Sequence, residues 1–392
     1  MRSEKQLELY IHIPFCIRKC RYCDFLSFAV RGKDSGDAAM LYDRYFSALK
    51  KEITGFDGEG CEIRSVFFGG GTPSAVPAEY LAEVLQLIRE KFVLAEDAEI
   101  SMEANPGTLD EEKLHIYKEA GISRLSLGLQ SVHNEELSLL GRIHTWEEFL
   151  DTYQKVRTAG FTNVNVDLMS ALPGQSAASW EESLRRIAAL SPEHISAYSL
   201  IIEEGTPFYE EYHEDARLRE EGEQPKLLPS EEVEREMYAL TEKILAEYGY
   251  HRYEISNYAK EGRECRHNLG YWKRIPYRGF GLGASSLIKE YRFANTESLE
   301  AYLKDPLQTG ETEELTREDQ IEETLMLGLR LTAGISKKEF ITEFGIDIND
   351  RYGAVIQRFC AENLLESTQE TLKLTEKGLD FADYIILSLI QS

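Results

Sequence analysis

The chain has 392 residues, 42% of them hydrophobic, which is enough to form one large domain with one or two smaller ones. Its formal charge of −25 disfavours nucleic acid as the main partner, because phosphate backbones would be repelled over most of the surface. The start MRSEKQLELY lacks the apolar run of a secretory signal, and no stretch approaches the roughly 18 apolar residues of a membrane span. We therefore expect a cytoplasmic protein that does not insert into a membrane.

The first 250 residues alternate between strand patterns and helix patterns. An apolar run followed by an amphipathic stretch occurs six times, which predicts six βα units. The pairs are 7–15 with 40–53, 65–71 with 77–92, 99–106 with 110–121, 124–131 with 145–160, 163–173 with 179–190, and 194–202 with 230–249. This alternation calls for parallel strands, in either an open doubly wound sheet or a barrel, complete or partial. In both folds the chemistry takes place beyond the carboxyl ends of the strands.

The pattern changes beyond about residue 285. Residues 316–345, 350–366 and 372–390 predict a helix, a turn, a helix, a small hairpin and a final helix, an order that resembles a winged helix. Winged helices often bind DNA, but these helices carry many acidic residues, so we favour a role in packing or protein interaction. The expected domains are a barrel over 1–250, a linking segment over 251–285 and a small α+β domain over 286–392.

Three of the six cysteines lie close together in the segment YIHIPFCIRKCRYCDF, after the first predicted strand. Cys16, Cys20 and Cys23 are spaced C-x3-C-x2-C, so a tight loop lets three thiolates converge, as they do in zinc sites and iron–sulfur clusters. In a reducing compartment such thiols indicate a metal before a disulfide. A structural zinc site is usually closed by a second Cys or His pair with its own short spacing, which the sequence lacks. Three ligands on a four-iron cluster leave one iron open to a substrate or cofactor.

This spacing, directly after the first strand of a βα series, resembles the radical S-adenosylmethionine (SAM) superfamily. The resemblance implies a partial (β/α)6 barrel and a [4Fe-4S] cluster held by Cys16, Cys20 and Cys23. It also implies that the amino and carboxylate groups of SAM chelate the open iron. The cleavage of SAM to a carbon radical is then chemistry that the cofactors supply.

Polar residues after successive strands match the SAM site of that superfamily. Each alone could be a structural group, but together they follow one another along the same rim, and the glycines of GGGTP let a backbone approach a ligand closely. The resemblance implies that Gly70, Gly71 and Thr72 receive the methionyl amino group, that Glu103 accepts from the same group, that Gln130 and Asp167 bind ribose hydroxyls, and that Arg142 pairs with the SAM carboxylate.

The segments YIHIPFCIRKCRYCDF, GGGTPS, EANP, GLQS and DLMSALPGQ together resemble the oxygen-independent coproporphyrinogen III oxidase family, over nearly the whole chain. The resemblance places Tyr10 beside the cluster and Tyr22 beside a SAM site. The oxidase branch converts two propionates to vinyl groups, and its motif has a fourth cysteine where this chain has Phe25. That branch also has an N-terminal extension that does not precede the first strand here. Both departures favour the other branch, the haem chaperones.

The segment CRHNLGYW, residues 265–272, matches the H-N-x-x-Y-W signature of the haem chaperones. A histidine beside aromatic rings suits haem, because neutral imidazole ligates iron and flat rings cover a porphyrin face. From chemistry alone, a histidine hydrogen-bonded at a domain junction is the simpler interpretation; the resemblance instead favours haem binding near this segment. The candidate haem residues are His267, Asn268, Tyr271 and Trp272, with Cys265 as a competing axial ligand and His12 as either a cavity residue or a structural one.

We therefore expect a protein that binds haem, a [4Fe-4S] cluster and SAM, and that delivers haem to apo-proteins such as respiratory cytochromes. In this family the cluster is tied to dimerisation and haem transfer, so a homodimer and contact with the inner membrane through a partner are further expectations. The alternative function is oxidative decarboxylation of coproporphyrinogen III, because the whole SAM site is present. Whether the protein is an enzyme stays open, and no catalytic residue is assigned. A nucleic-acid module is disfavoured by the charge.

Overall fold

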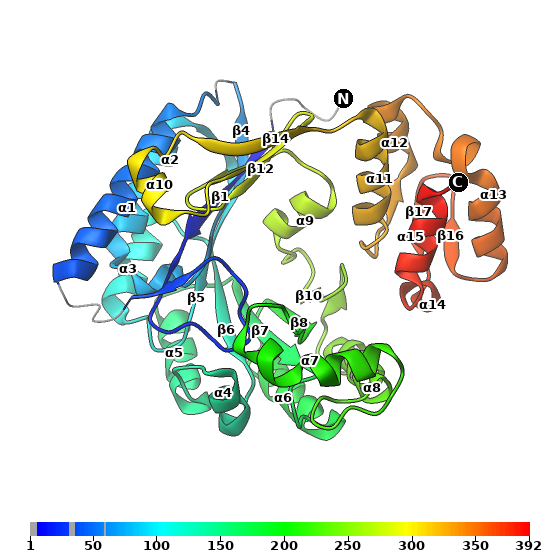
Figure 1. Cartoon of the computed structure of the whole chain (residues 1–392), viewed down its shortest axis with the longest axis horizontal. Coiled ribbons are helices and arrows are strands. Elements are labelled where there is room, and N and C mark those ends of the chain that lie inside the picture. Colours follow the sequence, from blue (N-terminus) through cyan, green and yellow to red (C-terminus); the bar gives the residue numbers. More distant parts are fainter. Residues whose placement is uncertain (1–5, 31–35, 59) are drawn as a thin grey trace.

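The computed structural model describes residues 6–30, 36–58 and 60–392. Residues 1–5 lie outside these ranges. They are part of the N-terminal segment in which we expect no signal sequence. A 12-stranded sheet, in the order β14-β13-β12-β11-β1-β4-β5-β6-β7-β8-β10-β9, curves through the larger part of the molecule. Helices α1, α2, α3, α5 and α6 cover its outer side, and a smaller body packs beside its open edge (Figure 1).

Six neighbouring parallel strands form the centre of this sheet. They are β1 (Gln6–Ile13), β4 (Glu62–Gly70), β5 (Val93–Ala104), β6 (Arg124–Gln130), β7 (Val164–Ser170) and β8 (His194–Ser199). The helices between and after them are α1 (Gly36–Gly55), α2 (Ala78–Lys91), α3 (Glu111–Ala120), α4 (Asn134–Leu140), α5 (Trp146–Thr158), α6 (Ala177–Ala189), α7 (Pro207–Glu220) and α8 (Glu231–Glu247), with a short 3-10 turn η1 (Pro73–Ala75). The predicted partial barrel of six βα units is confirmed.

Alternation along β1 separates the core from the inside of the barrel. Leu9 and Ile11 are fully buried in the main hydrophobic core, which the outer helices complete. Glu8, Tyr10 and His12 occupy the positions between them, so they lie on the opposite, inner face of the strand. The first strand therefore supplies polar and aromatic side chains to the barrel interior.

Residues 251–314 extend both edges of the sheet. Their elements are β9 (His251–Arg252), β10 (Asn257–Ala259), α9 (Arg266–Trp272), β11 (Tyr277–Phe280), β12 (Ser285–Ile288), β13 (Tyr291–Asn295), α10 (Leu299–Lys304) and β14 (Thr309–Glu314). Strand β10 pairs antiparallel with β8, whereas β11 pairs parallel with β1. Helix α9 runs between these two edges, on the concave side of the sheet (Figure 1).

This arrangement differs from the expected boundaries. The segment 251–285, expected as a linker, contributes strands to the sheet. Residues 286–314 also belong with the barrel, whereas the prediction assigned them to the C-terminal domain. The physical reason is that these strands are short and lack apolar alternation: β14 reads TGETEE and is exposed at all six positions. Without a buried face, such strands leave no period-two signal in the sequence.

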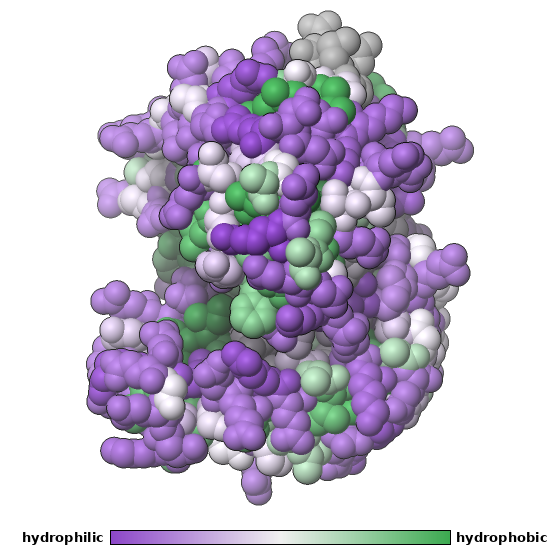
Figure 2. All heavy atoms as spheres, turned by 90° about the vertical axis from the view of Figure 1, so that its right-hand side faces the viewer, coloured by the Kyte–Doolittle hydropathy of each residue, from purple (hydrophilic) through white to green (hydrophobic). Residues whose placement is uncertain are grey.

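The C-terminal body begins after β14 and has its own core, which includes Leu325, Phe340 and Phe359. Its elements are α11 (Arg317–Gly328), β15 (Ile335–Ser336), α12 (Lys337–Phe344), α13 (Ile348–Ala361), β16 (Leu365–Ser367), β17 (Thr371–Leu374), α14 (Glu376–Leu379) and α15 (Ala382–Ile390). Strand β15 lies between α11 and α12, and the hairpin of β16 and β17 follows α13. The three strands form a small sheet ordered β15-β17-β16, which is the expected winged-helix-like arrangement. Figure 2 shows this side of the molecule as mostly hydrophilic, with apolar residues in small groups. Among the described residues, no helix combines the length and the apolar character needed to cross a bilayer.

Candidate cofactor site

The cysteine loop is fixed at the carboxyl end of β1 by the glycine segment that follows β4. Strand β2 (Phe15–Cys16) opens the loop and pairs with β3 (Phe28–Ala29), which closes it. The Gly71 N–H donates to Ile13 O over 2.8 Å, and the Thr72 N–H donates to Phe15 O over 2.8 Å. A Cβ atom on Gly71 would lie 2.8 Å from Phe15 O, so only glycine permits this approach. The GGGTP segment thus has a structural part as well as its expected ligand-binding part.

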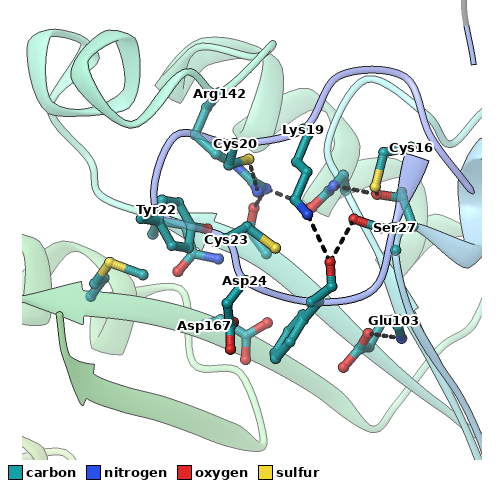
Figure 3. Close-up of a pocket in the computed structure, with 18 of the residues that line it drawn as sticks. Cys16, Lys19, Cys20, Tyr22, Cys23, Asp24, Ser27, Glu103, Arg142 and Asp167 are labelled. Atoms are coloured by element: carbon teal, nitrogen blue, oxygen red, sulfur yellow. Dashed lines mark hydrogen bonds between the residues drawn. The ribbon is translucent and has the colours of Figure 1, made fainter. Parts of the chain in front are cut away.

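The three cysteines and the predicted SAM residues line one cavity of about 390 Å³. Its walls include Cys16, Cys20, Tyr22, Cys23, Gly70, Gly71, Thr72, Glu103, Gln130, Arg142 and Asp167. The loop that carries the cysteines faces Glu103 and Asp167 across this space (Figure 3). The structure thus brings together residues that lie more than 100 positions apart in the chain.

The donor set around the cavity fits an iron–sulfur cluster. In the described ranges, no three His, Cys, Asp or Glu side chains stand close enough to hold a single metal ion. Three thiols on one cavity wall are the kind of ligand that holds an iron–sulfur cluster. Burial raises the pKa of the Cys23 thiol to about 11 and that of Cys16 above its usual value. The free thiols of Cys16 and Cys23 are therefore protonated at neutral pH, and binding of a cluster would release protons from them.

A chain of hydrogen bonds links Cys20 to Cys16 through polar residues of the cavity. Arg142 Nη1 donates to Cys20 Sγ over 3.5 Å, and its Nη2 donates to Asn105 Oδ1 over 2.5 Å and to the carbonyl of Gly128. Asn105 Nδ2 donates to Thr72 Oγ1 over 2.9 Å, and Thr72 Oγ1 donates to Cys16 Sγ over 3.5 Å. The guanidinium of Arg142 is therefore held in one orientation beside the thiols, ready for a carboxylate.

Two half-buried carboxyl groups form the opposite wall. Glu103 Oε2 accepts from the Gly70 N–H over 3.1 Å, and Asp167 accepts from Asn165 Nδ2 over 2.6 Å. Burial raises the pKa of Glu103 to about 8, with a further contribution from the charge of Asp167, and burial likewise raises the pKa of Asp167. Acids of this kind favour a ligand with hydroxyl groups or positive charge, which compensates their loss of hydration.

Sequence reasoning missed two residues of this site. Asn105 joins Arg142 to Thr72. It lies in the EANP segment, which the sequence analysis uses only as a family motif. Tyr198 on β8 donates to Gln130 Oε1 over 2.8 Å and lines the cavity. Its signal was present, because Tyr198 follows His194 and Ser196 at period two on the inner face of a predicted strand.

A second cavity of about 390 Å³ adjoins the first and shares Phe25, Gly70 and Glu103 with it. Its remaining lining includes three tyrosines and a histidine: Tyr10, His12, Leu26, Tyr271, Tyr277, Gly283, Ala284 and Ser285. Tyr10, which is expected beside the cluster, lines this second cavity, because it projects from the inner face of β1 before the cysteine loop begins. Phe25, at the position of the fourth cysteine, is 58% exposed and borders both cavities.

The ring nitrogens of His12 are both in hydrogen bonds. Nε2 bonds Leu26 O over 2.8 Å, and Nδ1 bonds the Tyr10 hydroxyl over 3.1 Å. The two roles that the sequence left open for His12, in the cavity and in the structure, are thus combined.

The predicted haem residues lie on α9, below the second cavity. His267 is 1% exposed, and burial lowers its pKa to about 3, so its ring is neutral. Its Nδ1 is 2.7 Å from Ser65 Oγ and its Nε2 is 3.0 Å from the Tyr271 hydroxyl. Cys265 is fully buried, and burial raises its pKa to about 12. Both residues expected as axial ligands are enclosed here, so the geometry matches the simpler interpretation of a hydrogen-bonded histidine. Tyr271 reaches the second cavity, and Asn268 and Trp272 are half-buried.

The acid beneath His267 leads to a prediction about pH. Burial raises the pKa of Glu8 to about 9, and the nearby Glu99 carboxylate raises it further, whereas Ser65 lowers it. Because this folded-state pKa lies above the unfolded value of about 4.3, wild-type stability should fall as pH rises from about 5 to 9. We expect Glu8→Gln to gain stability relative to wild type by up to about 1.4 kcal/mol per pH unit in that window. Urea unfolding of both proteins at several pH values measures this, and parallel pH profiles would contradict it.

Comparison with known proteins identifies the family. A model of the radical SAM superfamily matches residues 10–187, and a model of the HemN C-terminal domain matches residues 315–381. The heme chaperone HemW of Bacillus subtilis (strain 168) is 36% identical over 376 residues, which cover 94% of this chain and 95% of that protein. The chain belongs to the HemW branch of the radical SAM superfamily. The heme chaperone HemW of Escherichia coli (strain K12) agrees, with 33% identity over 97% of both chains.

A solved structure shows the same fold. The coproporphyrinogen III oxidase HemN from Escherichia coli, a radical SAM enzyme, superposes with a TM-score of 0.80 and 23% identity, covering 99% of this chain and 91% of that one. The predicted family, including its haem chaperone branch, is confirmed, and so is the fold class.

Proposed function

We propose that the protein binds a [4Fe-4S] cluster, SAM and haem, and that it delivers haem to apo-proteins such as respiratory cytochromes. The observation that carries this proposal is the match over nearly the full length to relatives named as heme chaperones. Phe25 supports it, because a ring that borders both cavities stands where the oxidase motif has its fourth cysteine.

The residues of the first cavity suit the two cofactors. Cys16, Cys20 and Cys23 would hold the cluster, which when bound supplies an electron and an open iron. Arg142 would bind the carboxylate of SAM, while Glu103 and Asp167 would accept from its amino and ribose groups. The second cavity then gives a planar ligand a place next to the cofactors, among aromatic rings.

The second candidate function is that of a coproporphyrinogen III oxidase. One observation favours it: all the residues predicted for the SAM site line a single cavity. A chaperone that binds SAM would keep the same walls, which is why the products must be measured.

One anaerobic experiment separates the two functions. The cluster is reconstituted, and haemin is added to one sample, while coproporphyrinogen III, SAM and a reductant are added to another. A stable haem absorption band without decarboxylated porphyrin is expected. Turnover to protoporphyrinogen without retained haem would instead identify an oxidase.

The Arg142 side chain gives a direct test of the SAM site. A charge-assisted hydrogen bond contributes about 1.5–3 kcal/mol, so Arg142→Gln should weaken SAM binding by about 10- to 100-fold. Equilibrium binding of SAM to the reconstituted protein measures this, with Arg263→Gln as a control on an exposed turn. Equal affinity of the Arg142 variant and wild type would remove Arg142 from the site.

A further inference from the structure

The hydroxyl of Tyr271 is held from behind by a buried histidine. Tyr271 lines the second cavity, and its hydroxyl lies 3.0 Å from His267 Nε2. The other ring nitrogen, Nδ1, lies 2.7 Å from Ser65 Oγ on β4, and Glu8 Oε2 lies 3.6 Å from the same nitrogen. A hydrogen-bonded chain therefore runs from the barrel strands, through His267, to the cavity wall.

Packing leaves the imidazole little freedom. Phe67 stacks on His267 with the ring centres 5.0 Å apart and the planes at 18°, and Tyr271 meets it edge-on at 4.8 Å. Gly270 contributes as well, because a Cβ atom there would lie 2.1 Å from the Glu8 carboxylate. To reach an iron atom in either cavity, the ring would have to leave Ser65 and Phe67, and Tyr271 would have to move aside.

We propose that His267 is a positioning residue for the haem ligand: it fixes the Tyr271 hydroxyl at the second cavity, where this hydroxyl bonds a carboxylate of the tetrapyrrole, and it does not coordinate iron. This inference rests on the proposed haem binding. The signature histidine then acts through the signature tyrosine, four residues later on the same helix.

Two proton arrangements are open to this chain, and in one of them Tyr271 is a donor towards the cavity. The neutral ring of His267 has one N–H. When the Ser65 hydroxyl donates to Nδ1, the N–H is on Nε2 and donates to the Tyr271 oxygen. The O–H of Tyr271 is then directed to an acceptor in the cavity. A propionate carboxylate is such an acceptor, and the surrounding rings of Tyr10, Phe25 and Tyr277 suit a flat conjugated ligand.

The test is a haemin titration of the full-length reconstituted protein and of three variants, Tyr271→Phe, His267→Leu and the double variant. Loss of one hydrogen bond to a charged group should weaken haemin binding about tenfold in Tyr271→Phe. His267→Leu should show a similar loss, and the double variant should be no weaker than Tyr271→Phe. The spin state of the bound iron should be the same in all four proteins. Tyr291→Phe, at an exposed position of strand β13, serves as a control without effect.

Several results would overturn this assignment. If His267→Leu changes the spin state of the iron and added imidazole restores it, His267 is a ligand. If the losses of the single variants add in the double variant, the two side chains act independently. SAM binding by each variant shows that its fold is intact, and His267→Gln provides a second substitution that keeps a polar group. If wild-type protein takes up no haemin, the proposed function itself fails, and that outcome is distinct from the other two.

Discussion

Replacing Cys16, Cys20 or Cys23 by serine is expected to abolish the iron–sulfur cluster. The three thiols line one cavity, and the rest of its wall includes the polar residues expected to bind SAM. Among the residues that the structure describes, no further thiol lines the cavity, so in each variant two thiols would have to hold a four-iron cluster alone. After anaerobic reconstitution, each variant should contain little iron and sulfide and should lack the visible absorption of the cluster.

The same chain supplies matched controls for this prediction. Cys61 and Cys360 are half-buried thiols outside the cavity, so Cys61→Ser and Cys360→Ser should keep the full content of iron and sulfide. SAM binding should follow the cluster, falling in the three loop variants and persisting in the two controls. Unchanged iron content in every loop variant would show that the loop is not the cluster site.

The candidate cofactor site could be predicted because of a geometric regularity. Parallel strands end at the same edge of a sheet, so residues that follow successive strands converge, whatever their separation in the chain. Arg142 and Cys20 are 122 positions apart, yet their side chains are in contact. A reader of the sequence needs only the strand ends and the residue types that follow them, and both were visible as apolar runs bounded by cysteine, glycine and acidic residues.

The second cavity could not be predicted in this way. Its wall includes Tyr277 and Ser285, which belong to strands β11 and β12 that were read as a linking segment. Strand β11 pairs with β1 across more than 260 positions, and no local pattern specifies that neighbour. For the same reason, the hydrogen-bond partner of His267 could not be predicted: Ser65 is 202 positions away, and the interpretation of the histidine as a haem residue came from the family resemblance.

A buried carboxylate joins several of the added elements to helix α1. Glu52 on α1 has no exposed side-chain surface, and its Oε1 accepts from Arg278 Nη2 over 2.7 Å and from Asn295 Nδ2 over 2.8 Å. Its Oε2 accepts from the Gly281 N–H over 2.9 Å and from the Tyr302 hydroxyl over 2.7 Å. One side chain thus joins α1 to β11, β13 and α10 in the main core.

Glu52→Ala is therefore expected to lower the free energy of unfolding by about 3–5 kcal/mol, because it leaves the Arg278 guanidinium buried without its counter-charge. Urea unfolding followed by circular dichroism measures the loss. The exposed pair of Lys50 and Glu83, 2.8 Å apart, offers the control: Lys50→Ala should cost less than about 1 kcal/mol. Since residues 283–285 line the second cavity directly after this junction, the same substitution should also weaken haemin binding in protein that remains folded. A loss of less than about 1 kcal/mol for Glu52→Ala would mean that water reaches Arg278 and that the added strands are held mainly by their pairing with β1.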